Sequence, residues 1–143
     1  MTREEILRKV DEADAAFNRR DADALSALYS EDARLVDQAA PGPIEGRAGV
    51  RQYIQSYFVA FPDLKWERIG VEVDGNTLVE EWRASGTHDG DLSGLPATHR
   101  RVSVDGCSVM HFDEDGFVFE EHNYWDEAAM LRQLGVMPEP ATA

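Results

Sequence analysis

The chain has 143 residues, of which 43% are hydrophobic and 29% are charged, and its formal net charge is -14. This composition is typical of a one-domain globular protein, and the negative charge argues against nucleic acid or an anionic membrane surface as a partner. No apolar run approaches the roughly 20 residues that span a bilayer, and the charged N-terminus lacks the apolar core of a signal peptide. We therefore expect a cytoplasmic protein with one domain at 1–135 and a flexible tail at 136–143.

Two helices are predicted at the N-terminus. Thr2 and Glu5 have the spacing of a capping box, and apolar residues follow them at helical intervals. Asp21 has the character of an N-cap for a second, short helix that includes residues 25–29. The segment 33–37 that follows could form a short strand.

The strongest helical pattern comes after a loop at 39–46 that is rich in proline and glycine. Apolar side chains recur there at i, i+3, i+4, i+7, i+8 and i+11, and they are Val50, Tyr53, Ile54, Tyr57, Phe58 and Phe61. Pro62 ends the helix. Because all six side chains share one face, this helix is expected to cover a large apolar surface.

After Pro62 the periodicity changes to that of strands. Strands are predicted at 64–73, 77–88, 99–112 and 117–125, and a final helix at 126–134 ends at Gly135. Helices followed by an antiparallel meander indicate an α+β fold. A curved antiparallel sheet with three N-terminal helices and a short C-terminal helix would enclose an apolar pocket suited to a small molecule.

Signals for metals and cofactors are missing from the sequence. It contains no GxGxxG, P-loop or GxSxG motif. The four histidines, His88, His99, His111 and His122, do not have the spacing of metal ligands. We therefore predict neither a metal nor a cofactor.

Acids and imidazoles on the strands remain as reactive groups. Side chains alternate along a strand, so three sets of residues should each share a face: Glu80, Trp82, Ala84, Gly86 and His88; Cys107, Val109 and His111; and Glu120, His122, Tyr124 and Asp126. If these faces line the pocket, His88 or His111 lies across it from Asp126. A carboxylate and an imidazole in an apolar pocket suit acid–base chemistry on a carbon acid.

Asp126 also has a purely structural interpretation. It directly precedes the last predicted helix, where aspartate is a common N-cap, although Ala129 leaves no capping box. The adjacent pairs Glu80–Glu81 and Glu120–Glu121 are of a kind that usually faces solvent, but one member of each pair must point inward.

Three segments carry a resemblance to a known family. They are IEGRAGVRQYIQSYFVAFPDL, EEWRASGTHDGDLSGLPATHRRV and FDEDGFVFEEHNYWDEAAMLRQLG. In this order they resemble the "AFPD", "GTHxGxxxGxPxTG" and "DxxxLLxQLG" blocks of the SnoaL-like polyketide cyclases, and NRRDADALSALYSEDA resembles the opening of the wider NTF2-like superfamily. The likeness covers nearly the whole chain.

The resemblance implies an NTF2-like cone, a homodimer, and catalysis without metal or cofactor. The best-understood members of the family close a ring of an aromatic polyketide ester by intramolecular aldol condensation. Asp126 matches the acid/base aspartate of the family, and His111 approximately matches its histidine. The residues expected to contact substrate are Phe17, Tyr53, Tyr57, Trp82, His88 and His122.

Two positions depart from the family pattern. His99 replaces a glycine after "PxT", and His122 replaces a common tryptophan. Both changes would alter the polarity around the expected site. The expected ligand is a small apolar or aromatic carbonyl compound. The alternatives are a steroid isomerase-like or dehydratase activity in the same pocket, and a non-catalytic module for ligand binding or dimerisation.

Overall fold

The computed structural model describes residues 1–141. Its elements are α1 (Arg3–Asn18), α2 (Ala22–Ser26), β1 (Tyr29–Asp37), β2 (Ile44–Glu45), α3 (Gly46–Ala60), β3 (Lys65–Asp74), β4 (Thr77–Thr87), β5 (Arg101–Phe112), β6 (Val118–Trp125) and α4 (Glu127–Gln133). The predicted tail at 136–143 ends in residues 142–143, which lie outside the described part of the chain.

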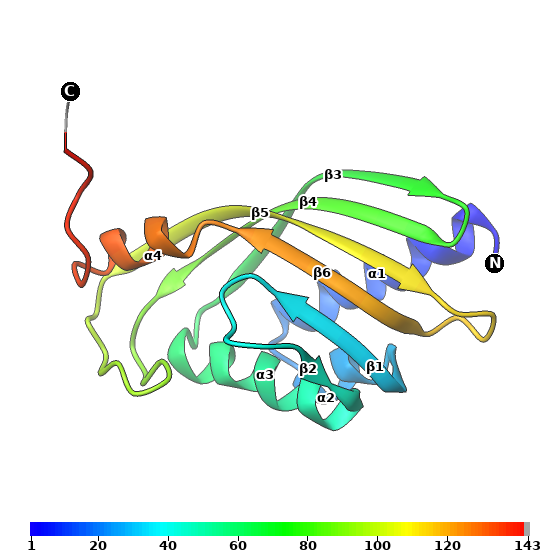
Figure 1. The fold of residues 1–143 in the computed structure, drawn as a ribbon, viewed down its shortest axis with the longest axis horizontal. Coiled ribbons are helices and arrows are strands. Elements are labelled where there is room, and N and C mark those ends of the chain that lie inside the picture. The colour runs from blue at the N-terminus through cyan, green and yellow to red at the C-terminus, as the bar shows by residue number, and fades with distance from the viewer. Residues whose placement is uncertain (142–143) are drawn as a thin grey trace.

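Six strands form one curved, unclosed sheet in the order β2-β1-β6-β5-β4-β3. Strands β3 to β6 make the predicted antiparallel meander, whereas β1 lies parallel to β6. Helices α1, α2 and α3 lie along one face of the sheet, and α4 lies at its end beside β5 (Figure 1). The predicted α+β cone is confirmed.

The helices begin where their caps were predicted. The Thr2 hydroxyl accepts the Glu5 N–H at 3.1 Å and the Glu5 carboxylate accepts the Thr2 N–H at 2.8 Å, which completes the capping box. The Asp21 carboxylate accepts the Ala24 N–H at 3.0 Å and caps α2. These bonds satisfy backbone N–H groups that a helix start leaves free.

The apolar faces of α1 and α3 supply most of the helical core. Val10 of α1 and Val50 of α3 are no more than 1% exposed, and Phe58 is 6% exposed. The expectation that α3 covers a large apolar surface is confirmed by its packing against β1. None of the helices in residues 1–141 has the length and apolar character needed to cross a membrane.

Strand β1 is longer than the predicted strand at 33–37 and begins at Tyr29, a residue that the local apolar pattern places in the second helix. Tyr29 pairs with Val118 of β6, and the Val118 N–H donates to the Leu28 carbonyl at 3.0 Å. Pairing with a strand so distant in sequence outweighs the local helical signal. The short strand β2 pairs with β1 and lies in the segment expected to be a loop.

Candidate active site

A cavity of about 150 Å³ lies between the helices and the sheet face that they cover. Its walls are mainly aromatic and aliphatic, and include Phe17 of α1, Tyr53 and Tyr57 of α3, Trp82 of β4 and Trp125 of β6. An apolar cavity of about this size holds a molecule the size of benzene. The site can therefore receive roughly one aromatic ring without rearrangement.

Trp82 forms one wall by lying flat over β5. Its ring stacks on Trp66 with centroids 4.4 Å apart, and its indole N–H donates to the Ser108 hydroxyl at 2.9 Å. The ring passes so close to Gly106 that a β-carbon at this position would collide with it. Glycine at position 106 is thus what lets the indole lie against the sheet.

Glu121 is a buried carboxyl group in this apolar cavity. The residue is 4% exposed, and its Oε1 accepts a 2.6 Å hydrogen bond from the Tyr29 hydroxyl. Asn123, two residues further along β6, also faces the cavity, and its carbonyl oxygen accepts from Ser108 at 2.6 Å. The Glu121 carboxyl therefore has fixed neighbours on two strands.

Burial raises the pKa of Glu121 from 4.5 to about 7. Hydrogen bonds from Tyr29 and Asn123 act in the lowering direction, and the nearby carboxylates Glu80 and Asp37 act in the raising direction. A carboxyl group with a pKa near neutrality can both accept and return a proton at physiological pH.

Hydroxyl donors and a second carboxylate lie on the α3 side of the cavity. The Tyr53 and Tyr57 hydroxyls are 3.4 Å apart, and Asp37 at the end of β1 accepts the Trp125 indole N–H at 2.9 Å. Burial raises the pKa of Tyr57 to about 12 and that of Tyr53 well above its usual value. Both phenols are therefore neutral hydrogen-bond donors at physiological pH.

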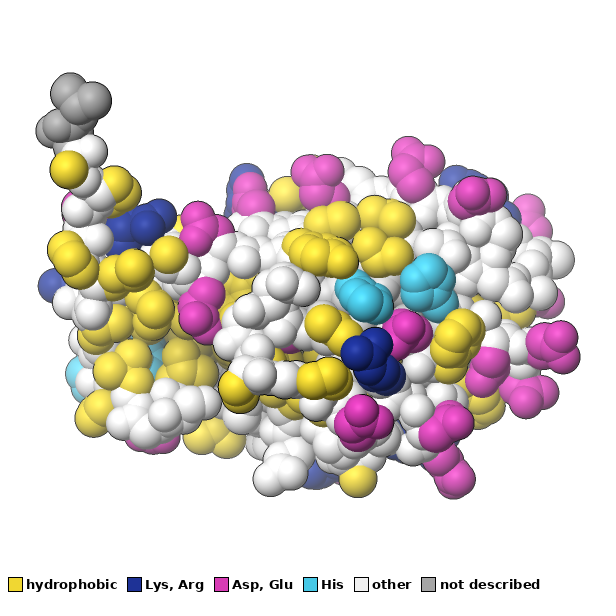
Figure 2. All heavy atoms as spheres, viewed as in Figure 1, with side chains coloured by type: hydrophobic (Ala, Val, Ile, Leu, Met, Phe, Trp, Pro, Cys, Tyr) yellow, Lys and Arg dark blue, Asp and Glu magenta, His cyan; other side chains and the backbone are white. Residues whose placement is uncertain are grey.

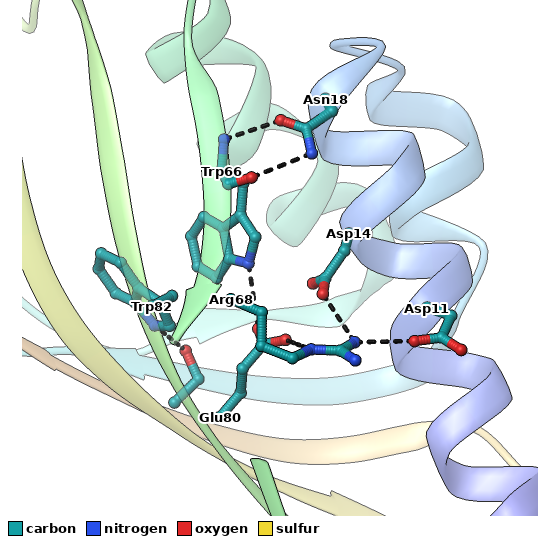
Figure 3. Close-up of polar contacts among 8 residues, drawn as sticks. Asp11, Asp14, Asn18, Trp66, Arg68, Glu80 and Trp82 are labelled. Atoms are coloured by element: carbon teal, nitrogen blue, oxygen red, sulfur yellow. Dashed lines mark hydrogen bonds and ion pairs between the residues drawn. The ribbon is translucent and has the colours of Figure 1, made fainter. Parts of the chain in front are cut away.

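On the α1 side, two further carboxyl groups line the cavity. Asp14 of α1 and Glu80 of β4 both contact the guanidinium of Arg68, which also reaches Asp11 (Figure 3). The Trp66 indole N–H donates to the other oxygen of Glu80 at 3.1 Å. The cavity thus has acidic groups along its length within an otherwise apolar lining.

Four of the expected substrate-binding residues line the cavity: Phe17, Tyr53, Tyr57 and Trp82. The expected inward face of β4 is also confirmed, since Glu80, Ala84 and Gly86 line the cavity with Trp82. Their contact with a substrate stays a prediction.

Asp126 lies outside the cavity. It is the N-cap of α4, where its carboxylate accepts the Ala129 N–H at 3.0 Å and lies 3.8 Å from Arg132. Its side chain is 63% exposed and borders an open surface hollow with Arg83 and Asp105. The N-cap interpretation is confirmed, and the acid/base role of Asp126 stays a prediction.

His111 and His122 lie on the outer face of the sheet. His111 Nδ1 is 3.0 Å from the Thr77 hydroxyl, and His122 Nε2 is 3.8 Å from the Glu120 carboxylate. The prediction that these faces of β5 and β6 line the cavity is therefore wrong, because the opposite face of each strand lines it. The cavity-facing residues of these strands are Val102, Val104, Ser108, Met110, Glu121, Asn123 and Trp125. The structure does not bring His111, His122 and Asp126 together around the cavity.

His88 directly follows β4 and is fully buried beside the cavity lining. Its Nδ1 accepts the Thr98 N–H at 3.1 Å, and its ring centroid is 5.5 Å from that of Phe61. His99 has a φ of 60°, a backbone conformation that favours the glycine present in the family at this position. Within residues 1–141, no three His, Cys, Asp or Glu side chains are grouped so that they could hold a metal ion.

Sequence reasoning did not single out Glu121, Asp14 or Asp37. The position of each residue in the sequence does, however, indicate a side chain that faces the interior. Glu121 is one of an adjacent pair of which one member had to face inward. Asp14 follows Val10 by four residues and so lies near the apolar face of α1, and Asp37 alternates with Leu35 along β1.

Solved structures similar to this one share its whole fold. A putative hydroxylase from Streptomyces galilaeus, AclR, is 23% identical with a TM-score of 0.84, over 96% of this chain and 89% of that one. A putative SnoaL-like polyketide cyclase from Jannaschia sp. CCS1 is 20% identical with a TM-score of 0.84, over 94% of both chains. A protein from Catenulispora acidiphila with a ketosteroid isomerase-like fold, in complex with trimethylamine, is 17% identical with a TM-score of 0.77, over 91% and 93%.

A comparison with curated proteins found no significant match. The model of one protein family, described as SnoaL-like polyketide cyclase, matches residues 8–134. This match includes every residue that lines the cavity. Because the family model matches most of its length and its fold is an NTF2-like cone, the chain belongs to the SnoaL-like polyketide cyclase family.

Proposed function

We propose that the chain binds a small, mainly apolar carbonyl compound in the cavity and moves a proton at the carbon next to the carbonyl. The observation that carries this proposal is Glu121, a carboxyl group with a pKa of about 7 in an apolar cavity. Its surroundings make it basic enough to take a proton from a carbon acid and acidic enough to return one.

The proposed reaction begins when Glu121 removes a proton from the carbon beside the carbonyl. The electron pair of the broken C–H bond forms an enolate, whose oxygen receives a hydrogen bond from Tyr53 or Tyr57. In a cyclisation, the enolate carbon attacks a second carbonyl of the same molecule, and the new alkoxide takes the proton held by Glu121. The aromatic walls would hold the two reacting carbons close together, which accelerates ring closure.

Isomerisation is the second candidate reaction. Here Glu121 would return the proton to a different carbon of the enolate, and no carbon–carbon bond would form. The likeness to a ketosteroid isomerase-like fold favours this alternative at the level of the fold. A pocket that only binds a ligand is the third alternative, and it predicts no proton exchange at all.

The acid/base roles expected for Asp126 and His111 are not part of this proposal. Both side chains lie away from the cavity lining, whereas a general base must come within hydrogen-bond reach of the proton it removes. A substrate lying in the cavity meets Glu121.

We also propose a homodimer formed through the outer face of the sheet. Phe119 and Tyr124 of β6 are 45% and 47% exposed there. Figure 2 shows hydrophobic side chains and histidines gathered over β5 and β6, with charged groups around them. The ion pair between Arg34 and Glu120 lies on this face as well, and an interface between subunits usually combines apolar and polar side chains in this way.

The proposed proton transfer can be tested before the natural substrate is known. Acetophenone deuterated at its methyl group is a ring-sized ketone, and its loss of deuterium to water is followed by proton NMR. The chain should accelerate this exchange, and Glu121→Gln should reduce the rate by about 100-fold or more. Glu120→Gln, the neighbouring residue on the outer face, is the matched control and should keep the rate. Equal rates in both variants would contradict the proposal.

A further inference from the structure

The cluster on the α1 side of the cavity has more acidic than basic groups. The Arg68 Nε donates to Glu80 Oε2 at 2.8 Å, and its Nη2 lies 2.7 Å from Asp14 Oδ2 and 3.0 Å from Asp11 Oδ1. Figure 3 shows the three carboxyl groups converging on one guanidinium. Within residues 1–141, no second cationic side chain contacts Asp14 or Glu80. Full ionisation would leave uncompensated negative charge.

The three carboxyl groups differ in their contact with water. The Asp11 side chain is 63% exposed, whereas the Asp14 side chain is 19% and that of Glu80 only 1% exposed. Water therefore stabilises the charge of Asp11, and Glu80 has both Arg68 and the Trp66 N–H as donors. Asp14 is the member of the cluster that can best hold a proton.

The pKa of Asp14 agrees with this geometry. Burial raises it from 3.8 to about 8, and the adjacent Glu80 raises it further through a hydrogen bond and its charge, against the opposing effect of Arg68. The other ionisable groups near the pair are Glu121 on β6 and Tyr29 on β1, both influenced by Glu80. Neither supplies a positive charge that would favour the ionised form of Asp14.

Asp14 also lies where a ligand would be. It lines the cavity next to Phe17 and Trp66, whose ring centroids are 4.6 Å apart. Protonated Asp14 can donate its O–H to Glu80, the hydrogen bond that helps raise its pKa. Glu80 keeps one donor on each oxygen, Arg68 and the Trp66 N–H, when that bond is given up. An oxygen of a ligand can therefore replace Glu80 as the acceptor of the Asp14 O–H at the edge of the aromatic pocket.

We propose that Asp14 carries a proton and donates a hydrogen bond to an oxygen of the bound compound, so that the cavity selects ligands with a hydrogen-bond acceptor on the α1 side. Asp14 is then a specificity-determining residue on α1, whereas Tyr53 and Tyr57 lie on α3. The ligand class is an aromatic ketone, quinone or ester with an oxygen at each end. This inference rests on the proposed function in one respect, which is that a ligand enters the cavity.

The test measures binding in place of turnover. Ethylbenzene, acetophenone and benzamidine have similar size and present no acceptor, a carbonyl acceptor and, at both pH values, a cation, respectively. Their dissociation constants are measured by NMR titration at pH 6.5 and 9.5. Glu121→Gln is the background protein, because it removes the other cavity-lining carboxyl group whose pKa is raised into this range. Acetophenone should bind about 10-fold more tightly than ethylbenzene at pH 6.5, the effect of one hydrogen bond. This preference should disappear at pH 9.5.

Variants of the cluster sharpen the result. Asp14→Asn keeps an N–H donor that does not titrate, so the preference for acetophenone should persist at both pH values. Asp14→Leu should abolish it. Asp11→Asn is the matched control, because it removes a charge from the same guanidinium but no donor from the cavity, and it should behave like the background protein.

Three results would overturn the inference. The first is an equal preference for acetophenone at both pH values in the background protein, a result that needs no Asp14 variant to fold. The second is an unchanged preference in Asp14→Leu. The third is tighter binding of benzamidine at pH 9.5 than at pH 6.5 without any preference for acetophenone, because it would indicate a cation site. If none of the three compounds binds, the proposed function fails together with the inference. If they bind and one of the three results above is found, only the inference about Asp14 fails.

Discussion

The Tyr29 hydroxyl on β1 donates a 2.6 Å hydrogen bond to the Glu121 carboxyl on β6, and both residues are buried. This bond acts against burial, because it lowers the pKa of Glu121 while loss of water raises it. The carboxyl group consequently titrates near neutrality. Parallel pairing of β1 with β6 brings the two residues together, although 92 positions separate them in the sequence.

Removing the Tyr29 hydroxyl should therefore change the pH dependence of the proposed reaction. Tyr29→Phe keeps the aromatic ring and deletes the donor, so the pKa of Glu121 should rise by about one unit, the equivalent of one hydrogen bond. The pH midpoint of acetophenone exchange should move upward accordingly. A variant that is slower at every pH with an unmoved midpoint would show that Tyr29 only supports the packing.

The stability of the protein should fall between pH 5 and pH 8.5. The folded-state pKa of Glu121 is raised, so its contribution to stability is fully present below pH 4.5 and is lost as the pH rises through about 7. Glu121→Gln should reduce the fall by roughly 1–3 kcal/mol, measured by urea unfolding at both pH values. An identical fall in the variant would contradict the burial of an ionisable Glu121.

Gly106→Ala should disturb the cavity wall. The added methyl group would collide with the Trp82 ring, which would lose its stacking on Trp66 or its hydrogen bond to Ser108. We expect a loss of roughly 1–3 kcal/mol in the free energy of unfolding, together with weaker acetophenone binding. Gly70→Ala in β3 is the control, since its β-carbon would meet nothing within 4 Å. Equal stability of the two variants would show that the ring can move aside freely.

The proposed dimer depends on the outer sheet face. Tyr124→Asp or Phe119→Asp would replace an exposed aromatic side chain of the interface with a negative charge, and either variant should shift sedimentation velocity profiles from dimer to monomer. Val59→Asp, an equally exposed apolar position on α3, should leave the dimer intact. A wild-type monomer at micromolar concentration, or a dimer that tolerates Tyr124→Asp, would rule out this interface.

Local periodicity predicted most of the fold. The apolar stripe of α3 and the caps of α1 and α2 lie where the sequence predicts them, with Phe61 directly after the last residue of α3. The strands of the meander begin and end within two residues of their predicted bounds. The start of β1 could not be predicted, because Tyr29 takes its strand conformation from β6, far along the chain. Local patterns contain no information about such a partner.

The site was harder to predict than the fold. Both faces of β6 mix polar and apolar side chains, so alternation alone could not decide between Glu120 and Glu121. The family resemblance drew attention to Asp126, whose position directly after β6 caps α4. The same resemblance implied four aromatic wall residues, Phe17, Tyr53, Tyr57 and Trp82, and all four line the cavity.

The pH profile of acetophenone exchange in three proteins tests the central claim most directly. The claim is that Glu121, and not Asp126, moves the proton. We predict that the wild-type rate rises with a midpoint near pH 7, where Glu121 loses its proton. Asp126→Asn, which keeps a good N-cap for α4, should show the same profile once the protein-free rate at each pH is subtracted. Glu121→Gln should show no rate above the protein-free rate at any pH. A rate no higher than the protein-free rate for Asp126→Asn, with a wild-type profile for Glu121→Gln, would contradict the claim and return the acid/base role to Asp126.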